Sequence, residues 1–317
     1  MIAPPVIAAE LWTAGQRRAA AIHEISYRAC FKPQLPAYFI ARYTAPGDIV
    51  YDPFSGRGTT AIEAALSGRR VIANDVNPLS ARLSAPRLMV PNLDAVAARL
   101  DDIPRKGSRR GAPDLAMFYE QRTLQEILGL RQWLQRRRRE GTVDAVDNWI
   151  GMVATNRLTG HSSGFFSVYS FPPNQAVSAR GQLRINTLRQ QQPSYRDTHT
   201  LILKKSRQLL RGMSETALGQ LRQAGASARF LTGDARHPPS IADGSVALTV
   251  TSPPFLDVVD YAGDNWLRGW FNSLPVDRIA KGITTPRNLS EWSAVMGAVL
   301  AALYSITRPG GVVAFEV

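Results

Sequence analysis

Short apolar runs alternate with amphipathic stretches at both ends of the chain, and this pattern predicts strands and helices in turn. Residues 48–52 and 70–75 are short apolar runs that read as strands, and residues 59–67 between them have the spacing of a helix. A strand, a helix and a strand within about 30 residues indicate two parallel strands joined by a helix. The same alternation returns near the C-terminal end, where we expect strands over 228–232, 246–250 and 311–317 and a helix over 289–307.

The middle of the chain has a different character. Gly, Pro and charged residues gather at 104–113, which predicts an exposed loop, and residues 117–139 predict a helix that ends in Arg136–Arg139. Residues 160–196 are rich in Gly, Ser, Asn, Gln, Arg and aromatic residues. We therefore predict an α/β fold in which one sheet domain, 1–79 and 226–317, is interrupted by a mostly helical, basic insertion, 80–225.

Composition and charge limit the classes of protein to which this chain can belong. The 317 residues are 44% apolar, which favours a protein with a packed core. The net charge of +13 favours binding to polyanions, of which nucleic acid is the first candidate; a proteome in which most proteins are basic is the alternative explanation. The single cysteine, Cys30, excludes an internal disulfide and a multi-cysteine zinc site, and the four histidines lack metal-ligand spacing. No apolar run approaches the roughly 20 residues of a membrane span, and no secretory signal is visible. We expect a cytoplasmic protein without a membrane segment or a metal.

The segment Asp52-Pro53-Phe54-Ser55-Gly56-Arg57-Gly58-Thr59-Thr60 lies between a predicted strand and a predicted helix. Parallel sheets bind ligands at this place, and Gly56 and Gly58 allow a ligand to approach the backbone closely. The third glycine of a dinucleotide fingerprint is missing, and a carboxylate stands where a pyrophosphate would approach. A ligand with cationic groups, such as S-adenosylmethionine, fits this turn better.

Two further carboxylates follow predicted strands. Asp75 ends the second strand, a position that typically binds ribose hydroxyls, and Asp234 follows a later strand and could accept a hydrogen bond from an adenine amine. Each acid alone could be a helix cap or a turn residue. Three acids, each just past a strand, favour a cofactor site.

The segment Thr251-Ser252-Pro253-Pro254-Phe255 directly follows the predicted strand 246–250. The two prolines restrict the chain and leave carbonyl acceptors, the Ser252 hydroxyl adds another acceptor, and Phe255 offers a flat face for stacking. Together they predict a pocket for an exocyclic amine on a base turned out of its helix. An ordinary Pro-Pro turn beside a core phenylalanine is the structural alternative.

With both motifs, the chain resembles the DNA amino-methyltransferases, which methylate exocyclic nitrogens with S-adenosylmethionine. The resemblance implies a Rossmann-like class I methyltransferase sheet with helices on both faces, and double-stranded DNA as partner. The order of motifs resembles the arrangement in which the target-recognition region is the insertion, here 80–225; a helical cap that only stabilises the sheet is the alternative. Ser-Pro-Pro variants of the tetrad are typical of members that act on cytosine N4.

Carried over by position, the resemblance implies a role for each motif residue. Ser252, Pro253, Pro254 and Phe255 would hold the target base as catalytic residues. Residues 31–36 are similar to the family's N-terminal motif. The implied cofactor-binding residues are Phe31, Pro33, Asp52, Pro53, Phe54, Gly56, Gly58, Thr59, Asp75, Asp234 and Ala235.

Other substrates stay open at this point. Adenine N6 in DNA, an amine in RNA, or a catalytically dead DNA-binding homologue would fit the same motifs, as would a restriction partner or a solitary enzyme. Methylation at cytosine carbon 5 needs a thiolate, and the only thiol, Cys30, lies far from the Pro-Pro loop in sequence, which argues against that reaction. Sheets of this family usually continue for two more strands, so we expect the 317 residues to form an incomplete sheet.

Overall fold

The computed structural model describes residues 19–27, 30–171, 177–238, 240–254, 263–283, 286 and 288–316. The elements that it contains are, in chain order, η1 (Ala21–His23), α1 (Gln34–Tyr43), β1 (Ile49–Asp52), α2 (Thr59–Leu66), β2 (Arg70–Asp75), α3 (Leu79–Ser84), η2 (Ala85–Arg87), α4 (Leu93–Asp102), α5 (Gln121–Arg139), α6 (Ala145–Arg157), α7 (Ala179–Leu188), α8 (Thr198–Leu209), α9 (Glu215–Ser227), β3 (Arg229–Thr232), β4 (Val246–Thr251), η3 (Gly263–Asn265), α10 (Trp266–Asn272), α11 (Val276–Gly282), α12 (Leu289–Ile306) and β5 (Thr307–Phe315).

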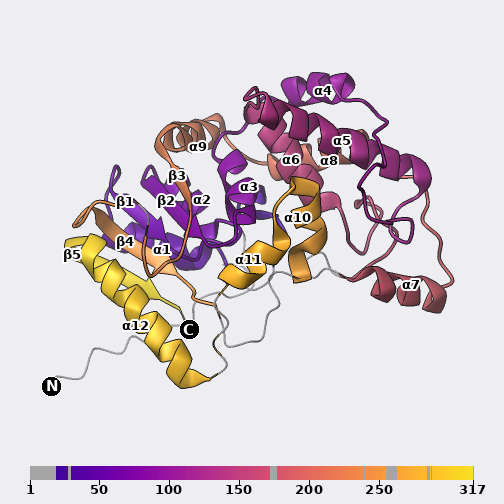
Figure 1. The fold of residues 1–317 in the computed structure, drawn as a ribbon. Helices are drawn as coiled ribbons and strands as arrows, with labels where there is room; N and C mark the ends of the chain where they lie inside the picture. The colour runs from indigo at the N-terminus through magenta and orange to yellow at the C-terminus, as the bar shows by residue number, and fades with distance from the viewer. Residues whose placement is uncertain are drawn as a thin grey trace.

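The strands form one sheet in the order β3-β2-β1-β4-β5, and every neighbouring pair is parallel (Figure 1). The chain moves outward from β1 to β2 and β3, and then returns to the centre for β4 before it ends at β5. The sheet therefore has a switch point between β1 and β4, where parallel α/β sheets leave a crevice at the carboxyl ends of the strands. This topology confirms the predicted Rossmann-like α/β fold.

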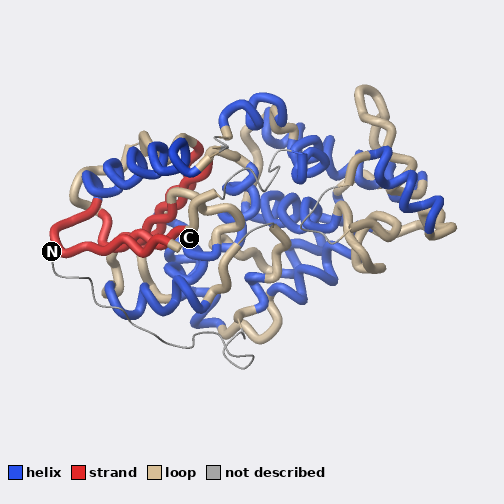
Figure 2. The backbone as a smooth tube through the Cα atoms, turned by 90° about the horizontal axis from the view of Figure 1, so that it is seen from below, coloured by secondary structure: helices blue, strands red, loops and turns tan. Residues whose placement is uncertain are grey.

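Helices cover both faces of the sheet, and alternate residues of each strand face opposite sides (Figure 2). Val50 and Val71 belong to a core that also includes residues of α1 and α2. Tyr51 and Ile72, the next residues along each strand, belong to a second core formed with α12. A strand buried on both faces reads as a continuous apolar run, which is why 48–52 and 70–75 stand out in the sequence.

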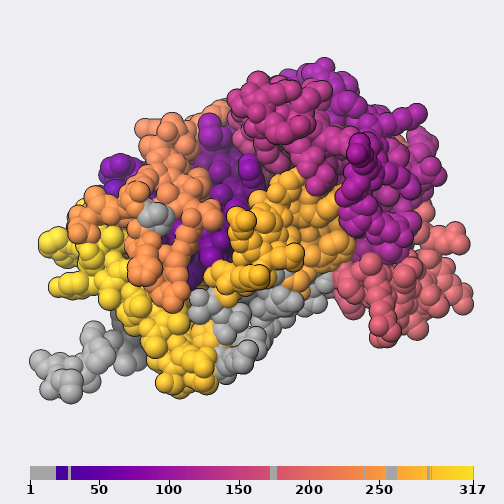
Figure 3. All heavy atoms as spheres, viewed as in Figure 1, coloured from indigo at the N-terminus to yellow at the C-terminus, as the bar shows by residue number. Residues whose placement is uncertain are grey.

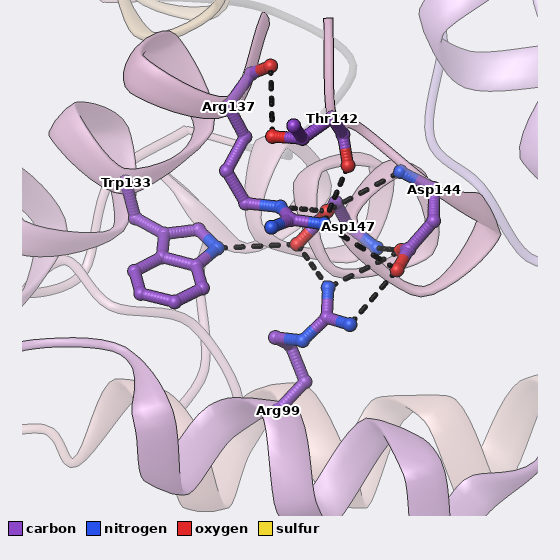
Figure 4. A network of polar contacts seen from close by, with 6 residues as sticks. All are labelled: Arg99, Trp133, Arg137, Thr142, Asp144 and Asp147. Carbon is purple, nitrogen blue, oxygen red and sulfur yellow. Dashed lines mark hydrogen bonds and ion pairs between the residues drawn. The ribbon is translucent and has the colours of Figure 1, made fainter. Parts of the chain in front are cut away.

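The helices of the insertion are joined by a buried ion-pair network (Figure 4). The fully buried Asp147 carboxylate accepts hydrogen bonds from Arg99 of α4 at 2.6 Å, from Arg137 of α5 at 2.5 Å and from the Trp133 indole at 3.1 Å. Asp144 caps α6, since its side chain accepts from the Asp147 amide while the Asp147 side chain accepts from the Asp144 amide. The network ties α4 and α5 to the first turn of α6.

The insertion continues the core of the sheet domain. One apolar cluster runs from the sheet side to residues of α5, α6 and α8. Helix α10 packs on α3, α5 and α6, and in Figure 3 its gold surface lies against the magenta surface of the insertion. Helix α9 packs on α2 and β2 and thus covers the sheet, although residues 215–225 fall inside the predicted insertion. The division into a sheet domain and an insertion, and the limits of the insertion, therefore stay predictions.

Helix α12 is the one candidate membrane span among the described residues, by length and composition alone. Its residues Met296, Val299, Leu303 and Ile306 are buried against the sheet, and 22% of the apolar stretch is buried. A core helix that covers a sheet meets the same criteria, so this feature is weak support for a span.

Candidate functional site: a cavity at the switch point of the sheet

A cavity with about 950 Å³ of empty space, its open mouth included, lies at the carboxyl ends of the central strands. The predicted site residues that line it come from the loops after β1, β2, β3 and β4: Pro53, Phe54, Gly56, Asp75, Asp234, Ala235, Ser252, Pro253 and Pro254. The switch point therefore brings the two sequence motifs, some 200 residues apart in the chain, into one cavity wall.

The turn after β1 depends on its two glycines. Gly56 has φ +49° and Gly58 has φ +76°, values that side chains with a Cβ rarely adopt. A Cβ on Gly58 would also collide with the Ser84 side chain, and one on Gly56 would lie 3.3 Å from the Tyr27 ring. The glycines thus let the turn pass between α3 and the N-terminal segment and present backbone to the cavity.

Asp52 lies behind this wall and does not line the cavity. Its carboxyl group, 2% exposed, accepts hydrogen bonds from the Thr251 hydroxyl at 2.7 Å and from the Phe54 amide at 3.1 Å. Burial raises the pKa of Asp52 to about 7, against the effect of these hydrogen bonds. Asp52 therefore holds the ends of β1 and β4 together, and its predicted contact with a cofactor stays a prediction.

Asp75 lines the cavity at the end of β2. It accepts hydrogen bonds from the amides of Gly56 at 2.8 Å and Asn77 at 2.9 Å, which fix its carboxylate against the glycine turn. Burial raises its pKa to about 6. Because hydroxyl donors stabilise the ionised form, a ribose bound here would return a favourable partner to a desolvated carboxylate. The position and hydrogen bonding of this carboxylate fit the predicted nucleoside cofactor.

Asp234 lines the cavity after β3, the strand paired with β2, and already has a hydrogen-bond partner. Arg236 donates to both of its carboxylate oxygens, with Nε at 3.0 and 2.9 Å, and lowers the pKa of Asp234. An adenine amine would thus share this carboxylate with Arg236, which stays a prediction. Ala235, next to it, is buried and offers an apolar surface to a ring.

The Pro-Pro loop is fixed by a helix that the motifs did not indicate. Trp292 of α12 donates from its indole Nε1 to the carbonyl of Pro254 at 3.1 Å, and Val295, Met296 and Val299 of the same helix line the cavity. Ser252 and Pro253 line it as well, whereas Phe255 lies outside the described residues. Beside the carbonyl held by Trp292, this loop has further acceptors in the Ser252 hydroxyl and the Pro253 carbonyl.

Several predicted residues lie near the cavity without lining it: Asp52, Gly58, Thr59, Phe31 and Pro33. The Phe31 carbonyl accepts from Arg57 at 3.5 Å, which ties the N-terminal segment to the turn, and Pro33 directly precedes α1. The sequence reasoning missed Tyr27, which lines the cavity, and the whole contribution of α12. Neither carries a local signal, because only tertiary packing brings them to the site.

In the described part of the chain, no group of three or more His, Cys, Asp or Glu side chains is placed to hold a metal ion. The side chains with polar groups that line the cavity are those of Asp75, Asp234, Asn77, Ser252 and Tyr27. They can orient an organic ligand and hold an amine by its protons.

Comparisons with known proteins point to one class of enzyme. Residues 8–85 match the N6_N4_Mtase family, described as DNA methylase. The Type II methyltransferase M.MjaII of Methanocaldococcus jannaschii is 32% identical over 80 residues, which are 25% of this chain and 15% of that protein, so the match spans a small part of that relative's length. Both matches support the DNA amino-methyltransferase family and leave the choice between cytosine N4 and adenine N6 open.

Among solved structures, the rRNA methyltransferase aviRa from Streptomyces viridochromogenes aligns with 97% of this chain and 82% of its own, at 14% identity and a TM-score of 0.34. With a TM-score of this size, the fold assignment rests on the sheet topology.

Proposed function

We propose that this chain binds S-adenosylmethionine in the cavity at the switch point and methylates the exocyclic N4 amine of a cytosine turned out of duplex DNA. The observation that carries the proposal is the meeting of the glycine turn, Asp75 and the Ser-Pro-Pro loop in one cavity wall. When bound, S-adenosylmethionine would supply a methyl group from its sulfonium: the carbon–sulfur bond breaks as the carbon–nitrogen bond forms, a neutral thioether leaves, and one amine proton is released to solvent. The chain's own residues bind and orient both partners.

On the cofactor side, Asp75 would accept the ribose hydroxyls, and the Gly56 turn would lie along the body of the cofactor. On the base side, the Ser252 hydroxyl and the Pro253 carbonyl would accept hydrogen bonds from the two protons of the amine. These bonds draw the nitrogen lone pair out of conjugation with the ring and direct it toward the methyl group. Positioning and fixed acceptors of this kind are expected sources of rate.

The charge distribution supports DNA as the partner. Residues 80–225 contain 23 Lys and Arg and 11 Asp and Glu, so they hold +12 of the net charge of +13. A charge surplus confined to one part of the chain is the electrostatic footprint of nucleic-acid binding, whereas a basic proteome would spread it over the whole chain. This part of the chain is the proposed DNA reader.

The experiment is methylation of mixed-sequence duplex DNA, followed by mass spectrometry of the nucleosides. N4-methylcytosine is the expected product, and it follows from the serine at the first position of the tetrad. N6-methyladenine would keep the mechanism and contradict the choice of base. The absence of any methylated nucleoside, with cofactor binding retained, would contradict the activity.

Two variants separate the proposed roles. Ser252→Ala removes an acceptor for the amine, so we expect turnover to fall about 10²–10³-fold with little change in cofactor Kd. Asp75→Ala removes the ribose acceptor, so we expect Kd for the cofactor to rise roughly 10–100-fold. Equal losses of turnover and affinity in both variants would contradict the assignment.

A further inference from the structure

A second depression lies on the other side of Tyr27, and it is lined with basic side chains. Tyr27 lines both this depression and the cofactor cavity. The cations that line the depression are Lys32, Arg57, Arg157 and Lys205, with His161 at its exposed side. We call this group of side chains the basic pocket. Its residues come from the N-terminal segment, the glycine turn, the end of α6 and α8, so the sheet domain and the insertion build it together.

Two of the cations are buried. Arg157 is 8% exposed and Lys205 is 6% exposed, and burial lowers the pKa of both groups, that of Arg157 to about 10. The positive charge of Arg268 lowers the pKa of Arg157 further. Buried cations are costly unless an anion accompanies them, because they lose their hydration.

The carboxylates of the described residues do not balance this charge. Glu24 is the acidic residue that lines the basic pocket, and it lies 3.4 Å from Lys205 and also accepts from Gln208 at 2.6 Å. Arg157 donates from Nε to the Asn156 carbonyl and stacks on the Phe165 ring at 4.0 Å, but no carboxylate of the described part forms an ion pair with it. Four cations thus face one partly exposed carboxylate.

The cations are also held in place before any ligand arrives. Arg57 donates to the carbonyls of Ile25 at 3.0 Å and Phe31 at 3.5 Å, which fixes its guanidinium group across the N-terminal segment. Phe165 holds the guanidinium of Arg157 by its ring face. These two fixed guanidinium groups have no carboxylate partner among the described residues, so they can bind an anion with little loss of side-chain entropy, and guanidinium groups match the oxygens of a phosphate.

We propose that the basic pocket binds a backbone phosphate of the nucleic-acid strand whose base enters the cavity beyond Tyr27. This step rests on the proposed function, since it takes the strand to be the substrate. A base in the cavity leaves its sugar and phosphates at the rim, and the basic pocket is a cationic depression separated from that cavity by one aromatic side chain. Free phosphate has the same chemistry, and the experiment below separates the two sources.

The test measures binding of a fluorescein-labelled mixed-sequence duplex by anisotropy over a range of KCl concentrations. A protein that loses one phosphate contact loses about 0.9 from the slope of log Kobs against log salt. We expect Lys205→Gln to lose about one unit of slope relative to the wild type. Lys204→Gln is the matched control, because Lys204 is the exposed neighbour on the same helix and does not line the pocket, and we expect its loss to be smaller.

Lys205 is buried, so its variant must be shown to fold by thermal melting, and Lys32→Gln provides an independent variant at an exposed position. We expect Lys32→Gln to reduce the slope in the same way. Wild-type slopes in both pocket variants would overturn the proposal. A second result would also overturn the proposal. If inorganic phosphate at matched ionic strength raised the Tm of the wild type but not that of the two pocket variants, while all three bound the duplex equally, the pocket would bind free phosphate.

The salt-dependence assay needs neither the cofactor nor methyl transfer, so its outcome is independent of the catalytic proposal. Normal methylation with unchanged slopes in the pocket variants overturns the phosphate site alone. A wild-type chain that binds no nucleic acid overturns both the phosphate site and the proposed substrate.

Discussion

Replacing Asp52 with asparagine tests how the centre of the sheet accommodates a buried carboxyl group. Burial raises the pKa of Asp52 from 3.8 to about 7 in the folded chain. The folded chain therefore binds one more proton than the unfolded chain between about pH 4 and 7, and its stability falls as the pH rises through that range. Above pH 7 the contribution of Asp52 to the free energy of unfolding no longer changes with pH. Asparagine keeps the shape and an acceptor for Thr251 and removes the titration.

The magnitude follows from the two pKa values. One pH unit corresponds to about 1.4 kcal/mol, so ionised Asp52 lowers the free energy of unfolding at pH 8 by about 4 kcal/mol. The asparagine amide adds a donor that costs about 1–3 kcal/mol if it stays unpaired. This cost is the same at every pH, and Asp75 titrates in both proteins. We therefore expect the stability of Asp52→Asn relative to the wild type to rise by about 3 kcal/mol between pH 5 and pH 8.

Urea denaturation of both proteins at pH 5 and pH 8 measures this difference directly. A difference between variant and wild type that is the same at the two pH values would refute the reasoning, because it would place the pKa of Asp52 in its ordinary range. A difference of the opposite sign would mean that the ionised carboxylate stabilises the folded chain.

Three further changes test the site and its support. Gly58→Ala should destabilise the fold by more than the roughly 1–2 kcal/mol of a left-handed residue, since its Cβ also collides with α3, whereas Gly47→Ala, at an open position of similar φ, should lose only that amount in a thermal melt. Trp292→Phe removes one hydrogen bond to the Pro-Pro loop and should lower kcat about tenfold with cofactor Kd unchanged; an equal change in both would contradict a positioning role. Asp147→Ala removes a fully buried carboxylate that pairs with two partly buried arginines and should cost about 3 kcal/mol in urea denaturation, while Asp144→Ala, at a partly exposed position, should cost less; similar losses would argue against burial as the cause.

The strands of the sheet could be predicted from the sequence because they are short apolar runs that end at polar residues. The expected strand 70–75 agrees with β2, and the expected helix 59–67 agrees with α2 to within one residue. The last strand begins earlier than expected, at Thr307, because Thr307 pairs with Val246 before the register shifts over Arg308–Gly311. Gly310 takes φ +75° there, and such an irregularity in a strand has no apolar signature.

The helices of the predicted insertion were harder to predict from the sequence than the strands. The predicted helix 117–139 is α5, which begins four residues later, at Gln121; the leucines and the isoleucine of its apolar side are buried: Leu124, Ile127, Leu128, Leu130 and Leu134. Helix α6 lies in the middle of the insertion and is buried around most of its circumference, from Asp147 to Arg157. A helix without an exposed face has no amphipathic period, so only the capping residue Asp144 marks its start in the sequence.

The two sequence motifs act as one unit because hydrogen bonds at the centre of the sheet join them. The Thr251 hydroxyl donates to Asp52 at 2.7 Å, and the Thr60 hydroxyl donates to the carbonyl of Val250 at 3.1 Å. The start of α2 and the end of β1 are thereby tied to the last residues of β4, directly before Ser252. A change in either loop alters the position of the other, so substitutions at Asp52 or Thr251 should affect cofactor binding and turnover together. Substitutions at Asp75 or Ser252, which face the cavity from separate loops, should affect them one at a time.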